Sequence, residues 1–105
     1  MQDDSNKKIE EIQILENHLQ NFLMQKQTIQ IELNEIQNAL EELKNADDEV
    51  YKMTAGFLIR ADKEKIKKEI EEKKKMLNLR IEAMEKQEKL IEKDVARLRA
   101  ELKSH

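Results

Sequence analysis

Side chains able to act as nucleophiles, acids or bases are scarce in this sequence of 105 residues. It has no cysteine, and its two histidines are His18, expected on a solvated helix flank, and the terminal His105. Glu69 lies in a charged stretch where no pocket is expected to shift its pKa. The lysine run 73–75 alternates with glutamates and is best explained as a solubilising surface. We therefore expect no enzyme activity, no metal site and no cofactor.

The composition favours long helices over a compact core. Charged residues make up 41% of the chain and aromatic residues 3%, with one glycine and no proline. This composition excludes an ordinary globular interior and is typical of coiled coils. The net charge of −3 gives no support for nucleic acid binding. No apolar run is long enough for a membrane span, so we expect a cytoplasmic protein.

Two stretches of the sequence follow a heptad pattern, with apolar residues spaced alternately by three and four. Between residues 12 and 43, nine of the ten seam positions are apolar, and Lys26 is the exception. The spacing resumes after Asp62, with Glu88 among its polar exceptions. The sequence thus predicts an N-terminal helix over residues 1–45 and a C-terminal helix over 63–105.

The segment 46–62 breaks this pattern and is predicted to form a β-hairpin. Two short apolar runs flank Gly56, which can supply the positive φ that a tight turn requires. A lone hairpin is marginally stable and leaves both edges unpaired. The segment is therefore either a simple connector or, as we favour, an oligomerising element whose copies close a shared barrel. The apolar residues that the helices cannot cover are Val50, Met53, Phe57, Leu58 and Ile59.

The predicted fold is thus dominated by α-helices: a long antiparallel two-helix coiled coil with a central β-hairpin, in a single domain over residues 1–105. In one register, facing residues have numbers that sum to 110, which places Ile12 opposite Leu98. A sum of 117 is the alternative. Both registers keep Lys26 near Glu88, whereas a sum of 103 separates them, and we predict that this pair fixes the register.

Five apolar residues of the first helix lie outside its seam, where charge is expected: Ile9, Ile14, Leu23, Met24 and Ile31. A wider apolar stripe, neighbours absent from the chain, or an exposed adhesive surface would each explain them. An exposed surface of this kind would suit loose binding of varied partners.

Three segments together make the sequence resemble the beta subunits of archaeal prefoldin. They are E-V-Y-K-M-T-A-G-F-L-I-R-A-D-K-E from Glu49 to Glu64, L-R-I-E-A-M-E-K-Q-E-K from Leu79 to Lys89, and the helix from Gln25 to Leu43. The resemblance implies a hexamer of two alpha and four beta subunits, whose hairpins form a double β-barrel from which coiled coils extend. It also implies an ATP-independent holdase that captures non-native proteins at the coiled-coil tips and passes them to group II chaperonin.

Two sets of residues take roles from this resemblance. The assembly residues would be Val50, Tyr51, Met53, Gly56, Phe57, Leu58 and Ile59. The client-binding tips would be Ile9, Ile12, Ile14, Leu15, Val95, Leu98 and Leu102. The alternative from another class is a structural coiled-coil or filament-forming scaffold protein, which would not need exposed apolar tips.

Overall fold

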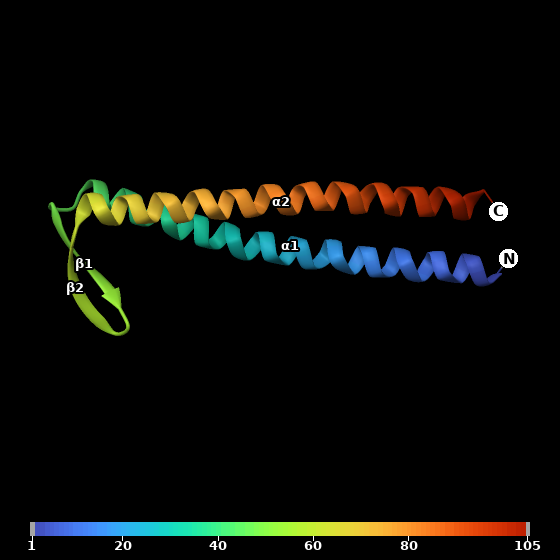
Figure 1. Cartoon of the computed structure of the whole chain (residues 1–105), viewed down its shortest axis with the longest axis horizontal. Helices are drawn as coiled ribbons and strands as arrows, with labels where there is room; N and C mark the ends of the chain where they lie inside the picture. Colours follow the sequence, from blue (N-terminus) through green and yellow to red (C-terminus); the bar gives the residue numbers. More distant parts are fainter. Residues whose placement is uncertain (1, 105) are drawn as a thin grey trace. The chain divides into compact units, whose positions relative to one another are not determined.

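A β-hairpin connects two long helices in the computed structural model, which describes residues 2–104 (Figure 1). Helix α1 spans Gln2–Lys44, strand β1 spans Glu49–Thr54, strand β2 spans Phe57–Asp62, and helix α2 spans Lys63–Lys103. The predicted helix, hairpin, helix order is confirmed. His105, one of the two histidines, lies outside the described residues.

Both helices are long because nothing in their sequences interrupts them. Neither α1, with 43 residues, nor α2, with 41 residues, contains glycine or proline. At 1.5 Å per residue, each is about 60 Å long. Helix α1 ends at Lys44, where the polar stretch Asn45–Asp48 replaces the heptad pattern.

The hairpin is antiparallel and closed by a two-residue turn. Its register pairs Glu49 with Asp62 at the base and Thr54 with Phe57 next to the turn. The turn residues Ala55 and Gly56 have φ values of 51° and 82°. Positive φ at both positions is typical of the type I′ turn, whose twist matches that of the strands. Gly56 therefore has the conformation that the sequence predicts.

One lysine closes the corner where the helices meet the hairpin. The backbone N–H of Lys63, the first residue of α2, donates to the carbonyl oxygen of Asp48 at 2.9 Å. Its ammonium group donates to the carbonyl oxygen of Ala46 at 3.0 Å and approaches that of Lys44 at 3.5 Å. Lys63 thus binds the carbonyl group of the last residue of α1 and two carbonyl groups of the connection that follows it.

The structure divides into two compact units, and both helices contribute to each. The terminal unit contains the chain up to Thr28 and from Arg80 onward. The hairpin unit contains Ile29–Leu79, and therefore the whole β-hairpin.

In the terminal unit, the seam side chains of the antiparallel helices form the core. Ile12, Val95 and Leu98 are buried together, and Leu15, Ile91 and Leu102 pack against them. This cluster agrees with the register of sum 110, since a sum of 117 would place Ile12 opposite residue 105.

The hairpin unit has a more polar seam. Ile29, Ile36 and Leu77 are buried, but Lys74 occupies a seam position and donates a hydrogen bond of 3.2 Å to Gln37. The helices in this unit therefore depend on fewer apolar contacts close to the hairpin.

Candidate functional site

The hairpin exposes apolar side chains on both of its faces. Paired residues share a face, so Met53 and Leu58 lie on one face, and Ile59 lies on the other beside Lys52. Phe57, next to the turn, is the most exposed of these residues, at 71%. Tyr51, Met53, Leu58 and Ile59 are also exposed, and Val50 is half-buried. The apolar residues predicted for assembly are thus open to a partner.

Both outer edges of the hairpin are unpaired in the described part of the chain. The sheet contains only β1 and β2, and each strand has six residues. Each outer edge therefore presents free backbone N–H and C=O groups to another strand. Exposed apolar faces and open edges together make the hairpin suited to pairing with copies of itself or with related chains.

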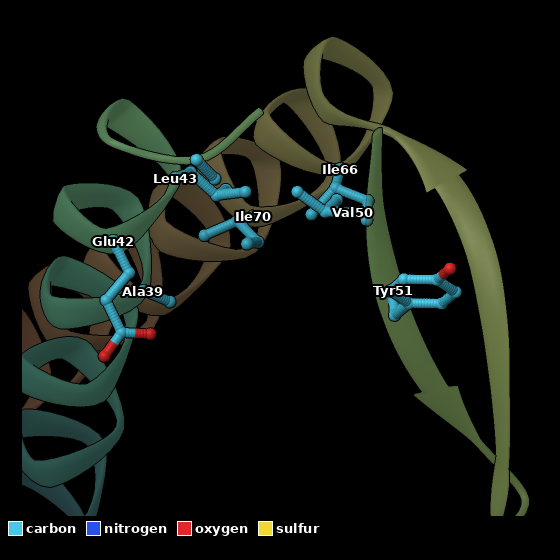
Figure 2. Close-up of a pocket in the computed structure, with 8 residues that line it drawn as sticks. Ala39, Glu42, Leu43, Val50, Tyr51, Ile66 and Ile70 are labelled. Atoms are coloured by element: carbon cyan, nitrogen blue, oxygen red, sulfur yellow. The ribbon is translucent and has the colours of Figure 1, made fainter. Parts of the chain in front are cut away.

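An open apolar pocket of about 280 Å³ lies where the hairpin meets the helices of its unit (Figure 2). Val50 and Tyr51 of β1 line one side, and Leu43, Ile66 and Ile70 of the helices line the other. Val50 lies close to Ile66, which explains why it is the most covered of the predicted assembly side chains.

One ion pair joins the hairpin to α2, and another lies within the hairpin. Lys52 Nζ lies 2.9 Å from Glu69 Oε2, and this contact lowers the pKa of the Glu69 carboxyl group. Within the hairpin, Arg60 and Glu49 approach to 3.6 Å. Both pairs are well exposed, so they orient the strands more than they stabilise them.

The residues predicted as client-binding tips fall into two groups. Ile9 and Ile14 are exposed, at 45% and 57%. The other five belong to the core cluster, in which Ile12, Val95 and Leu98 are buried and Leu15 and Leu102 are half-buried. Only Ile9 and Ile14 therefore offer large exposed side chains while the two helices remain packed.

A groove of about 230 Å³ lies beside Ile14 in the terminal unit. Leu15 and Leu98 line it, with Glu11, Asp94 and Arg97 around them. Further ion pairs join the helices here: Lys8 to Glu101 at 3.4 Å, and Arg99 to Glu16. Desolvation acts to raise the pKa of Glu101, but hydrogen bonds from Arg97 and Lys8 lower it overall.

The two charges within the terminal unit's seam meet. Lys26 Nζ lies 2.8 Å from Glu88 Oε1, an oxygen that is shielded from solvent. The contact with Glu88 raises the pKa of Lys26, burial opposes this rise, and Glu85 and Glu92 add to it. Within the described residues, this oxygen forms an ion pair with Lys26 but no hydrogen bond of regular geometry.

Three exposed apolar residues on α2 were not among those predicted from the sequence: Met76, Leu79 and Leu90. Their outward heptad positions were a signal that could have revealed them. Within the described residues, no helix is long and apolar enough to cross a membrane, and no three acidic or histidine side chains converge as metal ligands.

Comparison with known proteins agrees with this arrangement. A family model described as "Prefoldin subunit" matches residues 6–105. A prefoldin subunit beta of Saccharolobus islandicus is 38% identical over 92 residues, which cover 86% of this chain and 73% of that protein. For the prefoldin subunit beta of Thermococcus kodakarensis, the identity is 32%, over 90% of this chain and 82% of the relative.

A solved structure shares the fold along nearly all of the chain. The crystal structure of the prefoldin beta subunit from Thermococcus strain KS-1 matches with a TM-score of 0.87 at 30% sequence identity. The match covers 96% of this chain and 90% of that one. The long helices, the exposed hairpin and these similarities lead to one conclusion: the chain belongs to the prefoldin subunit family, and within it to the beta subunits.

Proposed function

We propose that this prefoldin chaperone subunit assembles into a hexamer of two alpha and four beta subunits. The hexamer would hold non-native proteins without ATP and deliver them to group II chaperonin in the cytoplasm. The observation that carries the proposal is that exposed apolar side chains occur in both units, on the hairpin and in the N-terminal part of α1. A structural coiled coil has no need for the second set.

The hairpin would form the assembly surface. Its unpaired edges and exposed residues, Phe57 and Leu58 above all, are unfavourable in an isolated chain. Pairing with hairpins of other subunits into a closed barrel would satisfy the edges and cover the side chains at once.

The terminal unit would contact the client. Ile9 and Ile14 would bind exposed apolar segments of a non-native protein directly. The core residues Ile12, Leu15, Val95, Leu98 and Leu102 would join the contact where the helices separate locally. Each contact is small, but several subunits held by one barrel would bind the same client with avidity.

The proposal is tested by replacing the two exposed isoleucines. In complexes assembled with an alpha partner, Ile9→Gln/Ile14→Gln should leave the mass unchanged. The variant complex should suppress aggregation of a chemically denatured protein less well than the unmodified complex. About a tenfold higher concentration of it should be needed for the same suppression, because two apolar contacts with the client are lost.

Met76→Gln/Leu79→Gln is the matched control, since it changes two equally exposed apolar residues of the other unit. It should suppress aggregation as the unmodified complex does. Full protection by the Ile9/Ile14 variant would contradict the client-binding assignment. Long polymers in electron micrographs would favour the filament-forming scaffold instead.

A further inference from the structure

Helix α1 has an uncharged stretch within the terminal unit. Residues 17–28 include one charged side chain, Lys26, and no aspartate, glutamate or arginine. In α2 of the same unit, 13 of the 24 residues 80–103 are charged. A chain that is 41% charged thus leaves one stretch of α1 in this unit almost without charge.

The single lysine does not charge the outer surface of this stretch. Lys26 lies in the seam and pairs with Glu88 at 2.8 Å. The outward positions, at helical spacing, are all exposed and hold Asn17, Gln20, Asn21, Met24, Gln27 and Thr28. Leu23, 44% exposed, lies at their margin. These seven residues are called the amide face below.

The amide groups of this face are free to bind. Among residues 2–104, no side-chain hydrogen bond engages Asn17, Gln20, Asn21 or Gln27. Each amide carries both a donor and an acceptor, as a peptide group does. Met24, 56% exposed, adds a flexible apolar side chain between them.

We propose that the amide face binds extended, non-native polypeptide segments through their backbone amides and apolar side chains, whatever the charge of the client. This inference rests on the proposed function and extends its client contact along α1 beyond Ile14. Unfolded chains of every sequence share unpaired peptide groups, and the face offers partners for them without a charge that would select among clients.

The size of the face favours this occupant over a second copy of the chain. Twelve helical residues span about 18 Å. The single helix face along this length is far too small to bury the roughly 1,200 Å² of a stable protein interface. A strand-like segment of about six residues covers the same length. The face therefore suits a short extended peptide segment.

Isosteric substitutions test the inference. Gln20→Glu/Gln27→Glu keeps side-chain volume but removes two donors and adds two charges. Outward positions of α2 already hold charged residues such as Lys86 and Lys93, so the helix should tolerate the change. The matched control, Asn78→Asp/Gln87→Glu, changes the net charge equally at exposed positions of α2.

The probe is an uncharged, fluorescent peptide of about twelve Leu, Ser and Gly residues, measured by anisotropy with the complete complex. Gln20→Glu/Gln27→Glu should weaken its binding about fivefold, and the control should not. Raising the salt to about 0.5 M should leave wild-type binding unchanged. N-methylation of alternate peptide bonds should weaken binding to the wild-type complex, because it removes backbone donors.

Equal binding by the Gln20/Gln27 variant and its control would overturn the inference while leaving Ile9 and Ile14 as the client site. Binding that does not respond to N-methylation would overturn backbone recognition. If the mass of the wild-type complex rose with concentration and that of the Gln20/Gln27 variant did not, the amide face would instead bind a second copy of the chain. If the complex bound neither peptide nor denatured protein, the proposed function would fail as well.

Discussion

At the scale of single residues, Ala55 is the one non-glycine residue with a positive φ in the described part of the chain. Its φ of 51° lies in the left-handed region, which costs an L-residue with a Cβ atom about 1–2 kcal/mol. The type I′ turn requires this conformation, and Asn-Gly and Asp-Gly are its preferred sequences. The Ala-Gly turn of this chain is therefore expected to be less stable than an Asn-Gly or Asp-Gly turn.

We predict that Ala55→Asn stabilises the protein by about 1 kcal/mol, because asparagine tolerates the left-handed conformation better than alanine does. Gly56→Ala should have the opposite effect, although a Cβ atom there would meet no neighbour within 4 Å. Denaturant unfolding of the assembled complex measures both. If the Ala55→Asn complex were no more stable than the wild type, the claim that the conformation of Ala55 lowers stability would be wrong.

Lys26 is the residue whose titration should matter most to the coiled coil. Contact with Glu88 raises its pKa above the ordinary 10.5 of a lysine. A group whose pKa is higher when folded contributes stability that is fully present below its unfolded pKa. That stability is lost as the pH rises through the folded value.

We therefore expect the unfolding free energy to fall more steeply above pH 10.5 in the wild type than in Lys26→Met. Comparison with this variant removes the titration of the other lysines. Denaturant unfolding between neutral pH and pH 12 provides the measurement. If the unfolding free energies of the two proteins changed with pH in parallel, protonation of Lys26 would not contribute to the stability of the fold.

At the scale of the elements, the Lys26–Glu88 pair interrupts an otherwise apolar seam in the terminal unit. The apolar cluster of Ile12, Val95 and Leu98 tolerates a slip by one heptad, since apolar residues recur every seven positions. A slip to the register of sum 103 would separate Lys26 from Glu88 and leave both charges partly buried. We propose that the pair therefore helps to set the register by excluding that slip.

Replacing one partner should be worse than replacing both. Glu88→Leu leaves Lys26 half-buried without its anion and should lower stability by about 1 kcal/mol. Lys26→Leu/Glu88→Leu should recover that stability but permit a second register, visible as additional crosslinks between cysteines placed on the two helices. A single crosslinking pattern in the double variant would mean that other contacts set the register.

Much of the fold could be predicted because its patterns are local. The heptads of 12–43 fix α1, and Gly56 between apolar runs fixes the hairpin. The positive φ of Ala55 could not be foreseen, because alanine gives no turn signal. Of the predicted tip residues, Ile12, Val95 and Leu98 are buried, as their seam positions dictate. Their part in client binding stays a prediction.

At the scale of the whole molecule, the chain leaves an unusual share of its large apolar side chains exposed. Thirteen are exposed among the described residues, and five of these lie on the hairpin. A monomer would keep this surface in water. Under the proposed function, the described hairpin, with two strands and no covering layer, would become part of a larger sheet.

We predict that Phe57→Asp/Ile59→Asp prevents assembly with an alpha partner, since charges would have to be buried between sheets. The purified variant should sediment as a subunit that retains its helical circular dichroism. Met76→Asp/Leu79→Asp makes the same kind of change outside the hairpin and should assemble normally. A hexamer formed by the hairpin variant would exclude this surface from assembly.

The two connections to the hairpin differ in length, and this difference determines where the hairpin unit can bend. Strand β2 ends at Asp62 and α2 begins at Lys63, with no residue between them. Four residues, Asn45–Asp48, separate α1 from β1. A rotation of the sheet and α2 relative to α1 would therefore be taken up by the backbone torsions of those four residues.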